Sequence, residues 1–161
     1  MEMHKNKIFH EWEFDNSYSR LPPRFYQRLN PTKVKLPELK IFNKELGKRL
    51  GVFCQDVEQI TSVFSGNEIP AGADPLAMAY AGHQFGSFVT QLGDGRAILL
   101  GEIKDKTGKL FDMQLKGAGK TQYSRQGDGR SALGPVLRDY LICESMNALG
   151  IPTTRALAVV T

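Results

Sequence analysis

The chain has 161 residues, of which 41% are hydrophobic and 24% are charged, and 21 Lys and Arg against 17 Asp and Glu give a formal net charge of +4. This apolar content excludes an intrinsically disordered chain, and the sequence has no run of about 18 apolar residues that would predict a membrane span. The mild positive charge suits an anionic ligand. Without a basic run or an interleaved aromatic stripe, we expect no nucleic-acid partner.

The N-terminus and the cysteines indicate a cytoplasmic protein. Residues 1–18 carry several acidic side chains and no long apolar stretch, unlike a signal or transit peptide. Cys54 and Cys143 are widely separated and lack Cys-x-x-Cys spacing. We therefore expect two buried thiols and neither a disulfide framework nor a zinc site.

Residues 1–72 are predicted to form an N-terminal extension with a short helix. Aromatic and proline residues dominate residues 1–40, a composition that suits a segment docked on another surface. A weaker helical pattern after residue 52 ends in a loop over residues 65–72. An amphipathic helix over residues 38–50 is predicted by apolar residues at helical spacing and a closing glycine: Leu39, Phe42, Leu46, Leu50 and Gly51.

Residues 73–161 are predicted to form a nucleotide-binding lobe. A helix is expected over residues 74–86, with Asp74 as its cap and Pro75 in its first turn. An Asp-Gly pair within Gly93–Gly95 predicts a tight hairpin. Three strands are expected to form an antiparallel meander: Phe88–Leu92, Arg96–Lys104 and Leu110–Lys116.

The rest of the chain supplies a loop, a helix and a strand. A glycine-rich loop over residues 117–130 leads into a helix over residues 135–149, whose apolar face we expect to pack on the sheet. The apolar run Ala156–Val160 has strand propensity. The predicted fold class is α+β: a protein-kinase-like amino-terminal lobe, built as an antiparallel meander with a packed helix and preceded by the extension.

A glycine turn followed by two strands, a lysine and a helix is typical of the nucleotide-binding lobe of protein kinases. There, backbone amides approach phosphates and a strand lysine supplies a fixed cation. Lys116 is the matching cation, on the polar face of its strand with Asp112 and Gln114. Taken singly, an Asp-Gly pair is a turn and a strand-end lysine is a solvated charge. Arg96 beside the turn and a second Gly-Asp-Gly-Arg at residues 127–130 together favour an anion-binding edge.

The segment Gly117–Thr121 ends in Gly-Lys-Thr but does not fit a P-loop. That motif requires a glycine five residues before Gly119, where this chain has Gln114, and a helix that starts at the lysine. We therefore expect residues 117–130 to remain a loop.

Two carboxylates on the predicted helix compete for Lys116. Glu144 lies on or beside the apolar face, where a carboxylate requires a cationic partner, and Asp139 is its rival. Five residues apart, they cannot both face the lysine squarely. Either could instead be a surface acid paired with Arg138 or Arg155, so the sequence leaves the partner open.

Other polar residues have structural interpretations. His83 is expected to be a hydrogen-bonded structural histidine, because no second metal-type residue stands at a useful spacing. Thr121, Tyr123 and Ser124 are expected to be polar loop residues, because no base is visible beside them.

Several long motifs resemble those of the selenoprotein O family. The likeness runs from about residue 14 to the end of the chain, and such dense agreement is not a chance event. It rests on Phe14–Tyr18, Tyr80–Gly86, Gln91–Ala97, Gln114–Thr121 and Gly150–Leu157.

The resemblance implies a kinase-like protein adenylyltransferase, which transfers AMP from ATP to hydroxyl side chains of proteins with ATP inverted relative to kinases and with magnesium as cofactor. It implies that the general-base aspartate and the metal-binding asparagine and aspartate lie beyond Thr161, so this chain alone is expected to be inactive. Family members place Glu where Asp139 stands. The implied ATP contacts are Gly93, Gly95, Arg96, Lys116, Asp128 and Gly129.

Two alternatives accompany this hypothesis. The chain could be a kinase-like ATP-binding or scaffold module without AMP transfer, and the mass added to a product would separate AMP transfer from phosphate transfer. It could also be a generic basic binding domain, whose affinity for polyanions would fall steeply with salt.

Overall fold

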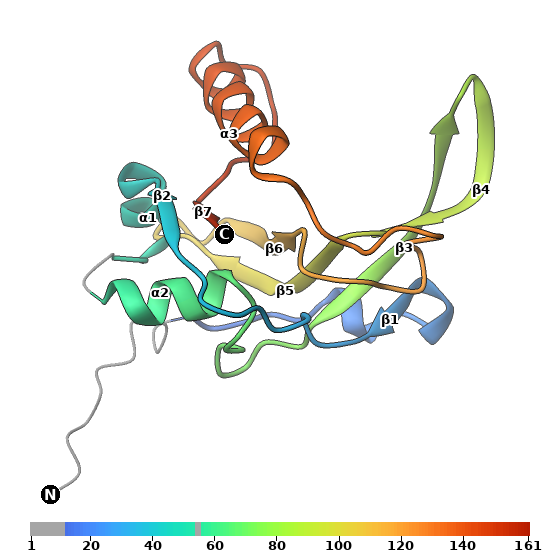
Figure 1. Cartoon of the computed structure of the whole chain (residues 1–161), viewed down its shortest axis with the longest axis horizontal. Helices are drawn as coiled ribbons and strands as arrows, with labels where there is room; N and C mark the ends of the chain where they lie inside the picture. The colour runs from blue at the N-terminus through green and yellow to red at the C-terminus, as the bar shows by residue number, and fades with distance from the viewer. Residues whose placement is uncertain (1–11, 54–55) are drawn as a thin grey trace, which may run out of the picture.

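A computed structural model of the protein describes residues 12–53 and 56–161. These residues form a mixed α+β fold with antiparallel strands, as the sequence predicts (Figure 1). The main sheet contains β1 (Tyr26–Arg28), β3 (Leu76–Gln84), β4 (Ser87–Gly93), β5 (Ala97–Lys104) and β6 (Leu110–Lys116); a second sheet pairs β2 (Leu39–Phe42) with β7 (Ala158–Val160). The helices are α1 (Lys44–Leu50), α2 (Val57–Phe64) and α3 (Leu133–Ala148), with 3-10 turns η1 (Tyr18–Arg20) and η2 (Pro23–Phe25).

The hairpin of β5 and β6 has the longest run of paired residues in the main sheet, with one register irregularity between Leu99 and Gly101. The strands pair antiparallel from Ala97 opposite Lys116 to Lys104 opposite Leu110. On β6, alternate residues are buried or turned toward solvent, and Lys116 lies on the polar face. The predicted strands over residues 96–104 and 110–116 are therefore confirmed.

The helix predicted over residues 74–86 is instead strand β3. The Asp74 carboxylate accepts a hydrogen bond from Arg28 Nε at 3.0 Å and caps no helix. Strand β3 pairs with β1, β4 and β5, and these long-range pairings outweigh the local helix signals. Phe85 and Gly86, with φ of 54° and 80°, form the two-residue turn between β3 and β4.

The hairpin predicted at Gly93–Gly95 is also wrong. Ala79 of β3 lies opposite Gly93 of β4, and Leu76 of β3 lies opposite Leu99 of β5, antiparallel in both cases. Strands β4 and β5 therefore run in the same direction, and both pair with β3. The segment Gly93–Gly95 connects them without reversing the chain. The true hairpin turn lies at residues 85–86.

The helix predicted over residues 38–50 is shorter than expected. Its first part is β2, which pairs with β7 from Leu39 opposite Val160 to Phe42 opposite Ala158. Helix α1 begins after Asn43, whose side chain accepts a hydrogen bond from the Leu46 N–H at 3.0 Å. The predicted closing glycine is confirmed, because Gly51 caps α1 in the left-handed conformation.

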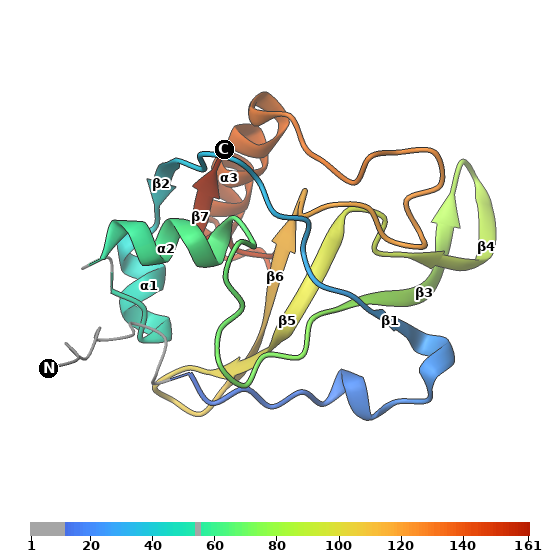
Figure 2. The same cartoon turned by 60° about the horizontal axis from the view of Figure 1, so that its bottom comes forward.

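The principal core lies where α1 and α2 pack beside β5 and β6 (Figure 2). The Trp12 ring meets the Phe14 ring edge-on at 5.7 Å, and the Asp15 N–H donates to Glu102 O at 2.9 Å, so this early segment docks on the body as expected. The core draws on residues before and after position 72, including Trp12, Leu46, Leu50, Val52, Ile60, Val63, Ile98, Leu100, Ile103, Met113, Leu115 and Leu157.

Helix α3 forms close to its predicted bounds but does not pack on the sheet as predicted. None of its residues is buried, and Leu141 and Ile142 remain 64% and 57% exposed. Figure 1 shows α3 standing away from the sheet and the β3–β4 hairpin extending at the other end. The predicted apolar face is therefore only partly covered: Val136, Leu137 and Tyr140 are half-buried, whereas Leu133 and Leu141 are exposed.

Two further predictions concern the thiols and the membrane. Cys143 is only partly buried, with its Sγ 3.6 Å from Thr154 Oγ1, so the buried thiol expected there is wrong. Cys54 lies outside the described residues. In the part of the chain that the structure describes, no helix has the length and apolar character that crossing a membrane requires.

Candidate functional site

Lys116, at the end of β6, forms an ion pair with Asp139 of α3. The Lys116 Nζ lies 2.5 Å from Asp139 Oδ2, and the two side chains are 52% and 48% exposed. The hydrogen bond and charge of Lys116 lower the pKa of Asp139, and Arg96 contributes to the same shift. Arg96 and Lys116 therefore bring two cations to one solvent-accessible edge.

Glu144, the rival carboxylate, faces a different cation. Its two carboxylate oxygens accept hydrogen bonds from Arg155 at 2.6 and 2.7 Å, a bidentate pair. This contact with Arg155 lowers the pKa of Glu144. The structure thus resolves the alternative left open by the sequence in favour of Asp139.

Asp94 anchors the first glycine segment, Gly93–Arg96. Its N–H donates to Met78 O at 2.9 Å, and its Oδ2 accepts from the Met78 N–H at 3.0 Å and from Gln114 Nε2 at 3.3 Å. Burial raises the pKa of this carboxyl, and the two hydrogen bonds only partly offset that effect. Sequence reasoning missed Asp94 because it treated the residue as part of a turn.

The second glycine segment, the loop over residues 117–130, folds against the first. The Thr121 hydroxyl donates to Asp94 O at 2.6 Å, and the Ser124 hydroxyl donates to Gly95 O at 2.5 Å. A Cβ added at Gly93 would lie 2.3 Å from the Tyr123 ring. Gly93 is thus required for close approach of the loop, and no helix begins at the Gly-Lys-Thr motif, which agrees with the rejection of a P-loop.

Asp128 and Gly129 lie farther along the same loop. The Asp128 carboxylate is exposed and accepts the Arg130 N–H at 2.8 Å. Gly129 has a φ of 74°, and its carbonyl accepts the Gly119 N–H at 3.1 Å. A Cβ there would lie 1.9 Å from Gly119 O, so this position accepts no side chain without movement of the backbone.

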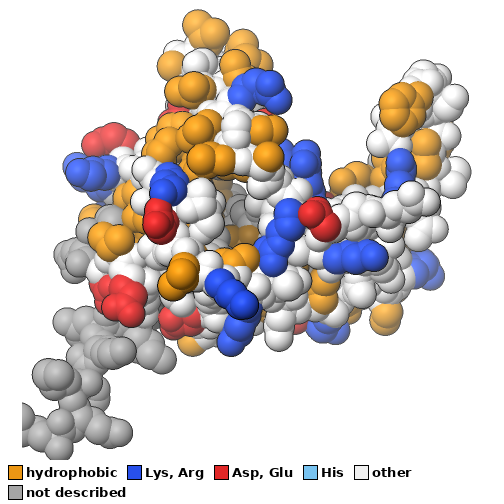
Figure 3. All heavy atoms as spheres, in the orientation of Figure 1, with side chains coloured by type: hydrophobic (Ala, Val, Ile, Leu, Met, Phe, Trp, Pro, Cys, Tyr) orange, Lys and Arg blue, Asp and Glu red, His pale blue; other side chains and the backbone are white. Residues whose placement is uncertain are grey.

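The six predicted ATP contacts thus lie on two touching loops and one strand end. Arg96 O accepts the Gly117 N–H at 2.6 Å, which joins the first segment to the residue after Lys116. Among the described residues, the N–H groups of Gly95, Arg96, Asp128 and Gly129 have no hydrogen-bond partner. Lys and Arg side chains gather on the face between α3 and the β3–β4 hairpin (Figure 3).

Other candidates do not join this site. His83 is exposed, makes no hydrogen bond with any described residue, and meets the Phe88 ring edge-on at 5.4 Å, so the predicted hydrogen bond is absent. Within residues 12–53 and 56–161, no group of three or more His, Cys, Asp or Glu residues could hold a metal ion.

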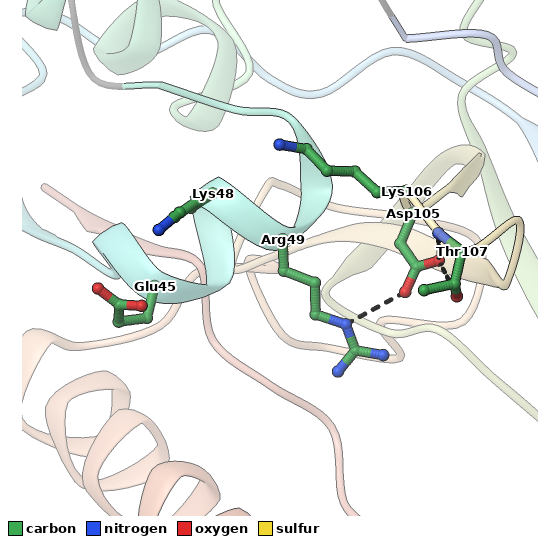
Figure 4. A pocket seen from close by; sticks show the side chains of 6 residues that line it. All are labelled: Glu45, Lys48, Arg49, Asp105, Lys106 and Thr107. Atoms are coloured by element: carbon green, nitrogen blue, oxygen red, sulfur yellow. Dashed lines mark hydrogen bonds and ion pairs between the residues drawn. The ribbon is translucent and has the colours of Figure 1, made fainter.

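The surface has two hollows, of which only one adjoins the predicted ATP contacts. One, of about 350 Å³, lies at the far end of β5, where Arg49 Nε approaches Asp105 Oδ2 at 3.2 Å (Figure 4). It contains none of the predicted site residues. The other, of about 370 Å³, adjoins the first glycine segment and is lined by Tyr80, Gln84, Gln91, Leu92, Gly93, Gln122, Tyr123 and Arg125.

A family model described as "Protein adenylyltransferase SelO" matches residues 8–161. The chain belongs to this family. It is 62% identical to the protein nucleotidyltransferase YdiU of Rhizobium meliloti (strain 1021) over 148 residues, which cover 91% of the chain and 30% of that relative. The corresponding protein of Geobacillus kaustophilus (strain HTA426) is 59% identical over 152 residues, 93% of the chain and 31% of the relative.

The SelO match confirms the family inferred from the motifs. A third relative, the YdiU protein of Roseobacter denitrificans (strain ATCC 33942 / OCh 114), is 61% identical over 145 residues. In all three cases the aligned part is 30% or 31% of the relative, so the chain spans about a third of the length of the curated SelO-family proteins it matches.

Proposed function

We propose that this chain supplies the ATP-binding part of a protein adenylyltransferase, which transfers AMP from ATP to Ser, Thr or Tyr hydroxyls of other proteins. The nucleotide-binding part is assigned to residues 73–161. The observation that carries the proposal is the meeting of Arg96 and Lys116 with the two glycine segments at one solvent-accessible edge. Family membership supplies the class of reaction.

The chemistry of the edge suits phosphate groups. Two cations offset the charge of a triphosphate, and unpartnered backbone N–H groups can donate to phosphate oxygens. Among the described residues, no group of three or more His, Cys, Asp or Glu side chains could hold a metal ion without the nucleotide. Magnesium would enter the site with the nucleotide.

In the proposed reaction, a protein hydroxyl oxygen forms a bond to the α-phosphorus of ATP while the bond between the α-phosphorus and the bridging oxygen breaks. Pyrophosphate leaves, and the hydroxyl proton passes to a base that we assign to sequence beyond Thr161. The role of Arg96 and Lys116 is to hold and neutralise the phosphates, which is how electrostatic placement lowers such a barrier.

Calorimetry with ATP and magnesium on this chain tests the phosphate site. Lys116→Ala should weaken binding by about 1.5–3 kcal/mol, the cost of losing hydrogen bonds to a charged group. Lys104→Ala is the matched control, because Lys104 is also an exposed lysine at a strand end but lies at the opposite end of the same hairpin.

Three results would count against the proposal. Absence of ATP binding would show that these loops do not hold the nucleotide by themselves. Equal binding by the wild type and Lys116→Ala would remove Lys116 from the site. In an assay of the complete protein with target proteins, a mass increase of phosphate alone would favour kinase chemistry, whereas an AMP adduct would support the proposal.

A further inference from the structure

The hollow at the far end of β5 lies between α1 and the turn that joins β5 to β6 (Figure 4). Its volume of about 350 Å³ falls within the usual range for small-molecule sites. Its lining contains no large apolar side chain, so it offers little to an apolar ligand and suits a small charged group. The lining consists of Glu45, Lys48, Arg49, Asp105, Lys106 and Thr107.

Arg49 is held in a fixed position at this hollow. Its Nε donates to Asp105 Oδ2 at 3.2 Å, and its guanidinium carbon lies 4.8 Å from the centre of the Phe111 ring. The Asp105 side chain is only 1% exposed, so the ion pair that orients Arg49 is anchored inside the protein. The two outer guanidinium nitrogens make no hydrogen bond with any described residue, and Figure 4 shows them turned away from Asp105. A guanidinium held in this way can donate two hydrogen bonds to one anion.

Two lysines bring further positive charge to the hollow. Lys48 precedes Arg49 on α1, and Lys106 stands in the turn, with its Nζ 5.6 Å from the centre of the exposed Phe53 ring. Figure 4 shows Lys106 reaching from the turn toward α1. Neither lysine forms an ion pair within residues 12–53 and 56–161. Both ammonium groups are therefore available to an anion.

The balance of charge favours a doubly charged anion. Three cations and two carboxylates line the hollow, and Lys109 adds a fourth cation, with its Nζ 5.3 Å from the centre of the Phe111 ring that Arg49 also covers. The surplus is therefore two positive charges. A phosphate monoester carries a charge of about −1.5 to −2 at pH 7 and three acceptor oxygens, whereas a carboxylate carries one charge and two oxygens.

We propose that this hollow binds a doubly charged phosphate group, with Arg49 donating from its outer nitrogens and with Lys48 and Lys106 closing on the remaining oxygens. Small phosphomonoesters and phosphorylated side chains of other proteins present the same dianion. The inference does not rest on the proposed function, because none of the predicted ATP contacts takes part.

A titration of this chain with glycerol phosphate, followed by the NMR shifts of the backbone amides, tests the site. The shifts should be largest at residues 48–49 and 105–107, which separates this hollow from the glycine segments at 93–96 and 127–130. The double variant Lys48→Ala/Lys106→Ala should weaken this binding about tenfold, because two charge-assisted contacts are lost. The matched control Lys44→Ala/Lys104→Ala removes two exposed lysines from α1 and β5 outside the lining, and should leave the affinity within about twofold.

Two single variants check the charge and the geometry of the hollow. Glu45→Gln removes a carboxylate from the lining and should strengthen phosphate binding about twofold, a gain that a poorly folded variant would not show. Arg49→Lys retains the positive charge but loses the guanidinium fork, and should weaken binding about fivefold.

The source of the phosphate is separated by a phosphoserine peptide, its unphosphorylated counterpart and glycerol phosphate. Tighter binding of the phosphopeptide than of glycerol phosphate would assign the hollow to phosphorylated proteins, and equal or weaker binding would assign it to free phosphomonoesters. The proposal is overturned if no phosphorylated probe shifts the amides of residues 48–49 and 105–107, or if the unphosphorylated peptide binds there as well as the phosphopeptide. It is also overturned if the control pair weakens binding as much as Lys48→Ala/Lys106→Ala does.

Discussion

The two ends of strand β5 each hold a buried aspartate, and the pKa values of the two carboxyls move in opposite directions. Asp94 precedes the strand and Asp105 follows it, and each residue is 6% exposed. The pKa of Asp94 is raised by burial. The pKa of Asp105 is lowered to about 2, first by the hydrogen bond from the Thr107 hydroxyl.

The difference lies in the donors that face each carboxylate. Asp105 accepts from the Thr107 hydroxyl at 2.6 Å, from the N–H groups of Thr107 and Lys109 at 2.8 and 3.1 Å, and from Arg49 at 3.2 Å. Asp94 accepts from two neutral donors and faces no cation. The Asp105 carboxylate is therefore fully hydrogen-bonded, mostly within its own turn at residues 105–109. At the other end of β5, called the loop end, the Asp94 carboxylate has fewer donors to offset its burial, and it positions the Gly93–Arg96 segment.

The largest expected effect is on the free energy of unfolding, when alanine replaces a glycine near either end of β5. Gly129→Ala combines a left-handed φ with a Cβ 1.9 Å from Gly119 O, and should lower the free energy of unfolding by about 3 kcal/mol or more. Gly108, in the Asp105 turn, has a φ of 83° but nothing within 4 Å of an added Cβ. Gly108→Ala should therefore cost only about 1 kcal/mol of strain.

Chemical denaturation of both variants measures this contrast. Gly134→Ala serves as a control of opposite sign, because Gly134 lies in α3 with open space around its Cβ position, and a helical alanine should stabilise by about 0.5–1 kcal/mol. Equal losses for Gly129→Ala and Gly108→Ala would mean that the loop end is no more tightly packed than the turn.

Asp105→Asn should lower the melting temperature clearly at neutral pH, because the new amide group would present donors to Arg49 and to the Thr107 and Lys109 N–H groups. The wild-type contribution has a definite pH dependence. Since the folded pKa of about 2 lies below the ordinary 3.8, the stabilisation is complete above pH 3.8 and is lost as pH falls toward 2. Melting curves from pH 6 to 2 should show a steeper acid loss for wild type than for Asp105→Asn, and parallel curves would contradict this account.

Asp94→Asn should have a smaller effect of opposite sign. The folded pKa of Asp94 lies above the ordinary 3.8, so its ionisation penalises folding increasingly as pH rises through that window. An asparagine can still accept the Met78 N–H, and it carries no buried charge. The variant should be as stable as wild type or more stable at pH 7 and should lose this advantage near pH 3, as thermal melts at the two pH values would show. A large loss of stability at pH 7 would show that the charge itself holds the loop.

The elements predicted correctly are those whose signals are local. The alternation of apolar and polar residues along β6 correctly predicted that Met113 and Leu115 are buried and that Lys116 lies on the polar face. Gly51 correctly predicted the end of α1. Strand β3 was missed because residues 76–81 are apolar throughout and lack the apolar–polar alternation of a half-buried strand, and the strand depends on pairing with β1, β4 and β5. The apolar pattern of α3 predicted a packed face, yet packing depends on a partner surface that the pattern does not specify.

The candidate site shows the same division between local signals, which the sequence carries, and contacts that depend on a distant partner. Lys116 and the glycine segments stand out by residue type and spacing, whereas the choice of Asp139 over Glu144 required the position of Arg155. The hollow beside Gly93 was missed because the helix predicted over residues 74–86 would separate Tyr80 and Gln84 from the loop that faces them. Its only sequence signal was the density of glutamine and tyrosine in the two segments.

The ion pair of Lys116 and Asp139 should give the smallest stability effect. Both side chains are about half exposed, so solvent screens their attraction, and Asp139→Ala should change the free energy of unfolding by no more than about 1 kcal/mol. Any loss should shrink in high salt, which screens exposed pairs but not the enclosed Asp105 carboxylate. Urea denaturation of Asp139→Ala and Asp105→Asn in low and high salt measures both points. A loss for Asp139→Ala that equals the loss for Asp105→Asn and resists salt would mean that the loop end is held by its charges as firmly as the turn, and the contrast between the two ends of β5 would fail.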